Sequence, residues 1–300
     1  MFRSFATTVL LFCFSGLVQG QSSAILTDWE TLKMDAQRMM QPDAFRTMQV
    51  GEQEVMIVTN ETNLPLGKGV IVLVSESGRN GASAISLAPM TEYLNDYGWA
   101  TILLTAPTLN WQIDESSMSS TDDLAPAPSE ETQQSQPDSS NMDDVPSYLS
   151  TPSINRKMFE AQEQQFMLLM NAANQEALNY PGFIVVVAQG TSAAFLSKLY
   201  AEGTLRAPDA MVAISANFPE KELNDEVGNF LARTPMPVMD IFNQWDNKWT
   251  TSNAKTRKIA AEKALKLHFR QREIIGTALK GQQFHYIAKE VHGWLTYMGW

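Results

Sequence analysis

Cysteine, histidine and long hydrophobic runs are scarce in this chain of 300 residues. The single cysteine, Cys13, lies in an apolar segment near the N-terminus. The remainder of the chain therefore has no disulfide, no thiolate metal site and no cysteine nucleophile. The sequence has three histidines and shows no Cys/His metal cluster, P-loop or dinucleotide-binding fingerprint. We predict neither a bound metal nor a cofactor.

No run after the first 20 residues is long and apolar enough for a transmembrane helix. The start itself has the pattern of a signal peptide, with a short basic beginning, an apolar run at 9–18 and cleavage expected after Gly20. An uncleaved anchor is the alternative, although the run is short for a hydrocarbon core of about 30 Å. Phe12 precedes Cys13 where a lipoprotein signal has Gly or Ala, so we expect no lipidation. The sequence predicts an exported protein comprising residues 21–300.

Positive charge is absent from residues 112–150, which hold nine acidic residues and no Lys or Arg. The formal net charge of the chain is −11, so the rest is close to neutral and has no basic surface typical of a nucleic-acid binder. The segment is rich in Ser, Pro, Asp, Gln and Glu and too poor in apolar residues to form a core. We predict a disordered acidic insertion at about 112–152. A lid over a pocket is the alternative.

Elsewhere, short β-rich runs alternate with helical ones. We expect strands at 54–59, 69–75, 99–105, 183–189, 210–215, 237–242 and 268–275, and helices at 83–97, 155–178, 192–200, 220–232, 254–267 and 283–298. The run 69–75 is continuously apolar, as in a strand buried on both faces, whereas 54–59 alternates in part and is expected at a sheet edge. This order predicts an α/β fold with a mostly parallel central sheet and helices on both faces.

The most informative segment is the strand at 183–189 and the helix that follows it. A strand, a sharp turn and a helix carry the nucleophile of α/β-hydrolases, usually in the pattern G-x-S-x-G. In this chain Ala188 and Ser192 replace the two glycines, and Gly190 occupies the position of the nucleophilic serine. The sequence keeps the architecture of the turn but not its reacting atom.

Several motifs together resemble a known family. They are Gly67–Glu76, Leu94–Thr101, Gln189–Gly190, His268–Gln271 and Val291–Leu295. With these motifs and the order of its elements, the chain is similar to the α/β-hydrolase-like bacterial proteins labelled domain of unknown function 3530. The resemblance implies a single α/β-hydrolase-like domain over 21–300 and an exported bacterial protein, which we expect in the periplasm. It implies no substrate.

A hydrolase of this fold needs a nucleophile, an acid and a histidine in that chain order. Thr191 and Ser192 carry the nearest hydroxyls, and Ser192 is the candidate nucleophile, or else it takes up a free backbone N–H in the first turn of its helix. Asp246, shortly after a predicted strand, either orients a histidine or caps the next helix. His285 either approaches the site from the start of the last helix or is an ordinary residue of that helix.

The loop at 75–81 would supply backbone N–H donors to an oxyanion, but Glu76 would place a carboxylate beside the developing negative charge. Our interpretation is a non-catalytic protein that binds a small-molecule ligand or an envelope protein. The alternative is a serine esterase or acyl hydrolase that uses Ser192, Asp246 and His285. A third hypothesis gives the function to the acidic insertion, which would bridge cationic partners or divalent ions.

Overall fold

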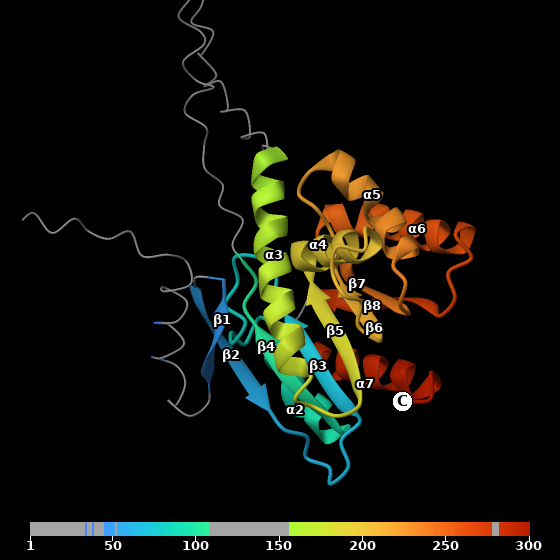
Figure 1. Cartoon of the computed structure of the whole chain (residues 1–300). Coiled ribbons are helices and arrows are strands. Elements are labelled where there is room, and N and C mark those ends of the chain that lie inside the picture. The colour runs from blue at the N-terminus through green and yellow to red at the C-terminus, as the bar shows by residue number, and fades with distance from the viewer. Residues whose placement is uncertain (1–33, 35–37, 39–44, 52, 108–155, 278–281) are drawn as a thin grey trace, which may run out of the picture.

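The computed structural model describes residues 34, 38, 45–51, 53–107, 156–277 and 282–300. The expected signal peptide and acidic insertion lie outside the described residues. The described strands form one sheet in the order β1-β2-β4-β3-β5-β6-β7-β8 (Figure 1). Their bounds are β1 Arg46–Val50, β2 Gln53–Asn60, β3 Gly69–Val74, β4 Trp99–Leu104, β5 Phe183–Gln189, β6 Ala210–Ile214, β7 Val238–Trp245 and β8 Phe269–Thr277.

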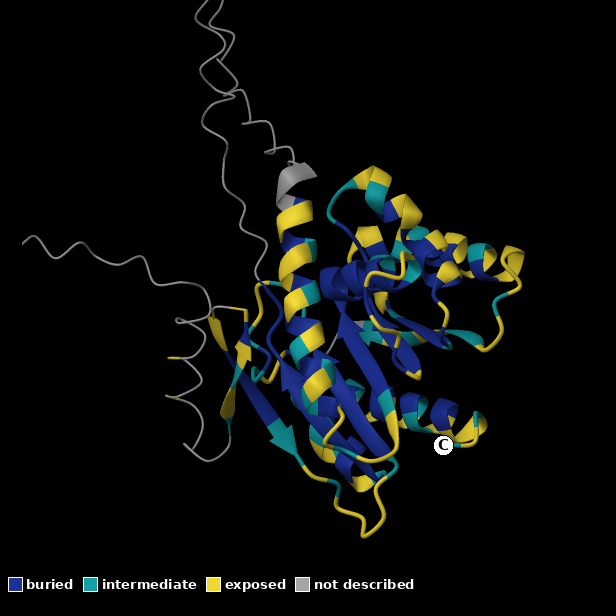
Figure 2. Cartoon of the chain, in the orientation of Figure 1, coloured by how far each residue is buried: buried dark blue, intermediate teal, exposed yellow. Residues whose placement is uncertain are grey.

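The sheet is parallel from β4 to β8, and β2 is antiparallel to both of its neighbours, β1 and β4. Every residue of β3, β4 and β6 is buried, which explains their continuous apolar sequences (Figure 2). The predicted α/β fold with a mostly parallel sheet is confirmed.

Helices cover both faces of the sheet. One face packs against α2 (Met90–Asp96) and α7 (Gln282–Tyr297), with Trp99, Phe284 and Trp294 among the buried residues. The other face carries α3 (Arg156–Ala177), α4 (Gly190–Ala201) and α5 (Lys221–Arg233), around a cluster that includes Phe166 and Phe195. The helix α6 (Lys248–Lys263) packs against α5 and β7.

Three expectations about the elements are wrong. The strand at 54–59 is not at an edge, because the short, polar β1 pairs with β2 and takes that place. The helix expected at 83–97 begins only after Pro89, since the residues before it form turns in which the Ser86 hydroxyl bonds to backbone carbonyls. The helix expected at 254–267 begins at Lys248, capped by Asn247.

Within the described residues, no helix has the length and apolar character needed to cross a bilayer. The same part of the chain contains no group of three or more His, Cys, Asp or Glu side chains arranged to hold a metal ion.

Candidate functional site

The turn from β5 into α4 forms a sharp elbow at the carboxyl end of the sheet (Figure 1). Gln189 has an extended backbone (φ −120°, ψ 143°), and Gly190 is left-handed, with φ +59°. Glycine adopts this conformation without the steric cost that a side chain would incur. The elbow expected of an α/β-hydrolase is therefore present, and Gly190 lies at its apex.

The carboxylate of Glu76 fills the space above Gly190. A Cβ atom at residue 190 would lie 2.6 Å from Oε1 of Glu76, closer than unbonded atoms allow. Arg79 holds this carboxylate through a bond of 2.8 Å from Nε to Oε2. Burial raises the pKa of Glu76 above its usual value; the Arg79 charge opposes this rise, and the nearby Asp246 carboxylate adds to it. The place of a nucleophile's side chain thus holds an acidic group.

Ser192 lies in the first turn of α4 and is fully buried. Its hydroxyl donates a hydrogen bond of 2.6 Å to the backbone carbonyl of Ser75, at the end of β3. The helix has no side-chain cap, so the expected role of Ser192 in accepting a backbone N–H is wrong. Its hydroxyl instead ties α4 to the loop that carries Glu76.

Asp246 follows β7 at the same end of the sheet. Its carboxylate accepts hydrogen bonds from the Ser215 hydroxyl and from two backbone N–H groups, those of Asn243 (3.4 Å) and Asn247 (2.9 Å). The cap of α6 is Asn247, whose side chain accepts from Thr250 N at 2.8 Å. The expectation that Asp246 caps this helix is wrong, because Asn247 is the cap and the Asp246 carboxylate bonds to Ser215 and to backbone N–H groups that precede the helix.

His285 is exposed, in the first turns of α7. Its ring contacts that of Tyr93 in α2 at 5.0 Å between centroids. Among the described residues, no hydrogen bond or ion pair joins His285 to Ser192 or Asp246. His292, seven residues further along the same face of α7, stacks on Tyr97 with 4.2 Å between ring centroids. Burial lowers its pKa, and the Lys68 charge acts in the same direction. The structure therefore does not bring the three proposed triad residues together.

Sequence reasoning overlooked Ser215, the partner of Asp246. This residue directly follows β6 and has φ +55°, which is unusual for a residue with a side chain. Its carbonyl accepts from the Asn217 amide at 2.7 Å and from the Thr250 hydroxyl at 3.1 Å. A serine at the carboxyl end of a predicted parallel strand was the available signal, since these strand ends meet at one edge of the sheet.

A model of the family described as "Protein of unknown function (DUF3530)" matches residues 23–297. The chain belongs to this family. No curated protein is significantly similar to it.

Solved structures of hydrolases share the fold at low sequence identity. Est1E from Butyrivibrio proteoclasticus has a TM-score of 0.55 and 8% identity, over 85% of this chain and 98% of that one. A sugar hydrolase from Lactococcus lactis has a TM-score of 0.53 and 8% identity, with coverages of 85% and 98%. A putative dienelactone hydrolase from Klebsiella pneumoniae has a TM-score of 0.51 and 11% identity, with coverages of 84% and 98%. The DUF3530 chain thus has the α/β-hydrolase fold.

Proposed function

We propose that this DUF3530 protein has no serine-hydrolase activity and binds a ligand or an envelope protein at the carboxyl end of its sheet. The observation that carries the proposal is the Glu76 carboxylate above Gly190. A nucleophile at this elbow would need both a side chain at residue 190 and free space above it. An ionised carboxylate there also opposes the negative charge that forms during acyl transfer.

The positions of the other two triad residues support the same proposal. The Ser192 hydroxyl is buried and donates a hydrogen bond to the backbone carbonyl of Ser75, a group that cannot act as a general base. His285 lies against Tyr93. A serine hydrolase needs its nucleophile and base within hydrogen-bond reach of each other, although such bonds are often longer in unliganded structures.

Buried polar groups that lack hydrogen-bond partners support a binding role for the protein. The side-chain oxygen Oε1 of Gln189, the Thr191 hydroxyl and the side-chain amide of Asn243 are buried and have no hydrogen-bond partner within the described part of the chain. Buried polar groups are nearly always satisfied, so such groups at the β5–α4 turn and near the carboxyl end of β7 favour a ligand or ordered water that completes them. Open α/β sheets also bind ligands at the carboxyl ends of their strands.

Export to the periplasm is part of the proposal and rests on the pattern of residues 1–20. Intact-mass measurement of the protein from the periplasmic fraction tests it. Cleavage after Gly20 would give the mass of residues 21–300. A mass that includes the first 20 residues would support an anchored protein.

The loss of catalysis is tested with a fluorophosphonate probe and with short-chain acyl esters, a substrate class suggested by the esterases that share the fold. We expect no probe labelling and no ester turnover above background. The matched control is Ser197→Ala, because Ser197 is also a buried serine of α4 with a bonded hydroxyl.

The opposite result would establish the alternative, a serine esterase using Ser192, Asp246 and His285. In that case the probe would label Ser192, and labelling would disappear in Ser192→Ala and His285→Ala but persist in Ser197→Ala. Labelling that disappears only in Ser192→Ala would point to a reactive serine with a base other than His285.

A further inference from the structure

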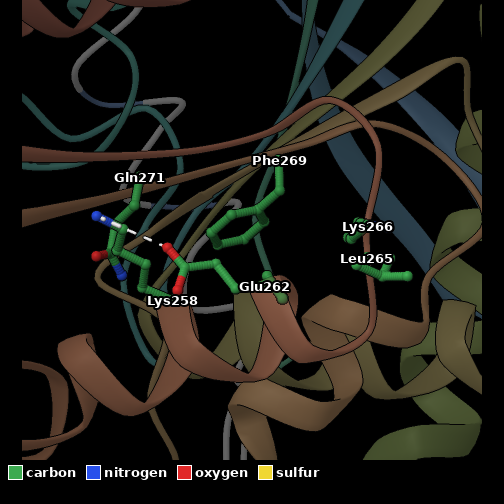
Figure 3. Close-up of a pocket in the computed structure, with 7 residues that line it drawn as sticks. Lys258, Glu262, Leu265, Lys266, Phe269 and Gln271 are labelled. Atoms are coloured by element: carbon green, nitrogen blue, oxygen red, sulfur yellow. Dashed lines mark ion pairs between the residues drawn. The ribbon is translucent and has the colours of Figure 1, made fainter.

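A cavity lies far along the sheet from Gly190, between the second half of α6 and the start of β8. Its volume is about 220 Å³. Figure 3 shows Lys258 and Glu262 reaching it from α6, Leu265 and Lys266 from the turn, and Phe269 and Gln271 from β8. Phe269 pairs with Val238 at the beginning of β7, so the cavity lies at the amino end of these strands, opposite the elbow.

An unusual turn places Lys266 in the wall of this cavity. Leu265 is left-handed, with φ +50°, and the backbone N–H of Lys266 bonds to the Ala261 carbonyl at 3.0 Å. This is the turn that commonly ends a helix, but glycine usually occupies the left-handed position. His268, directly before Phe269, is also left-handed. Strained backbone of this kind persists where the surrounding structure holds it and is concentrated at functional sites.

The ammonium group of Lys266 is half-buried and has no acidic partner in the described part of the chain. Its one hydrogen bond goes to the backbone carbonyl of Thr234, at the end of α5. Burial lowers the pKa of Lys266 to about 8. A desolvated cation that lacks a counter-charge is energetically unfavourable, and an anion bound beside it would remove this cost.

The second lysine of the cavity, Lys258, has an acidic partner. Lys258 lies 3.9 Å from Glu262, one turn along α6, and both side chains are largely exposed (Figure 3). The charge of Lys258 is therefore compensated within the helix, whereas that of Lys266 is not. Apolar surface lies next to Lys266, because Ala261 and Phe269 line the cavity and Leu265 is 84% exposed.

We propose that this cavity binds a small organic carboxylate, with its anionic group at Lys266 Nζ and an apolar body against Phe269 and Leu265. The volume suits a molecule about the size of a single aromatic ring with a carboxylate. The bond to Thr234 leaves two of the three ammonium N–H donors for such a ligand. This binding is independent of the binding proposed at the carboxyl end of the sheet.

The test is an NMR titration of the full chain with benzoate, benzamide and inorganic phosphate. We expect saturable shifts from benzoate in residues of the cavity, and much weaker binding of the neutral benzamide and of phosphate. Lys266→Met should weaken benzoate binding by roughly tenfold or more, and Lys266→Arg should retain it within a few-fold. Lys258→Met, the matched control, should change it less than about threefold.

Three results would overturn the proposal. They are equal binding of benzamide and benzoate, equal losses in Lys266→Met and Lys258→Met, and benzoate shifts that map outside the cavity. Phosphate binding as strong as that of benzoate would show that contacts of an apolar ligand body with Phe269 and Leu265 do not contribute to binding. If Lys266→Met does not fold, the comparison of benzoate with benzamide in the unchanged protein and in Lys266→Arg still decides the question.

Discussion

The arginine–carboxylate pairs Arg257–Asp240 and Arg79–Glu76 have the same Nε–oxygen distance, 2.8 Å, in different surroundings. Arg257 and Asp240 join α6 to β7, with exposed side-chain fractions of 1% and 0%. Arg79 and Glu76 lie over Gly190, with fractions of 44% and 24%. The geometry of the bond is thus alike, and what differs is how far water reaches it.

The buried pair is held by further contacts. Arg257 donates to the Thr250 carbonyl at 2.9 Å, and Gln271 donates to the Asp240 carboxylate at 2.8 Å. The pair over Gly190 is local, because its residues are three apart in one loop. We infer that Arg257 and Asp240 fix the position of α6. Arg79 and Glu76 contribute little to the stability of the fold, and we infer that their role lies in the candidate site at Gly190.

The largest expected effect comes from removing one partner of the buried pair. Arg257→Met should lower the free energy of unfolding by about 3–5 kcal/mol, because the buried Asp240 carboxylate would lose the opposite charge of Arg257. Arg79→Met, the matched control, should cost less than about 1 kcal/mol. Chemical denaturation of both variants measures the two values. Similar losses would contradict the distinction between the pairs.

This comparison also shows what the sequence could predict. The buried strands β3 and β5 were predictable from continuous apolar runs, and the elbow from Gln189 and Gly190 at the end of one of them. These features depend on neighbouring residues and on a common layout of the fold. The chain's own local pattern was therefore sufficient for these strands and for the turn, although not for β1, whose short, polar sequence gave no such signal.

The contacts of the site were not predictable in the same way. Ser192 bonds to the carbonyl of Ser75, a residue 117 positions away. Sequence reasoning identified Glu76 as unfavourable for an oxyanion but could not place its carboxylate over Gly190. Asp240, within an apolar run, gave no sign of its pairing with Arg257. Such contacts depend on how distant elements pack, which local periodicity does not encode.

The next largest effect is expected from a side chain at residue 190, which tests whether Glu76 blocks the elbow. Gly190→Ser should destabilise the protein by about 1–2 kcal/mol, because a serine has to adopt the left-handed backbone of residue 190. The contact between its Cβ and the Glu76 side chain should add to this loss of stability. Adding Glu76→Ala should recover part of the loss, with a coupling energy of roughly 0.5–1 kcal/mol or more. Additive effects in the double variant would mean that the Glu76 side chain moves aside without cost.

A smaller effect concerns the bond that anchors the Glu76 loop to α4. Ser192→Ala should cost about 1 kcal/mol, because the Ser75 carbonyl loses its donor. Ser197→Ala removes a bond to the Ala193 carbonyl four residues earlier, within the same helix, and should cost less. Thermal unfolding of the two variants measures the difference. A larger loss in Ser197→Ala would contradict an anchoring role for Ser192.

The smallest effect is a pH dependence of the pair over Gly190. Because burial raises the pKa of Glu76, its charged form is disfavoured in the folded protein relative to the unfolded chain. The stability that this group contributes is therefore greatest below its unfolded pKa and is lost as the pH rises through the folded value. Glu76→Gln, which is neutral at every pH, should be equal to or slightly more stable than the unchanged protein at pH 7, by less than about 1 kcal/mol.

As the pH falls from 7 towards 4, this advantage of Glu76→Gln should shrink, since the unchanged protein then gains from protonation of Glu76. Asp246→Asn should lower the pKa of Glu76, because the Asp246 charge contributes to the rise. NMR titration of the Glu76 carboxyl carbon measures this shift directly. A pKa of Glu76 that does not change in Asp246→Asn would show that the two carboxylates do not interact across the elbow, and the site would then consist of two independent acidic groups.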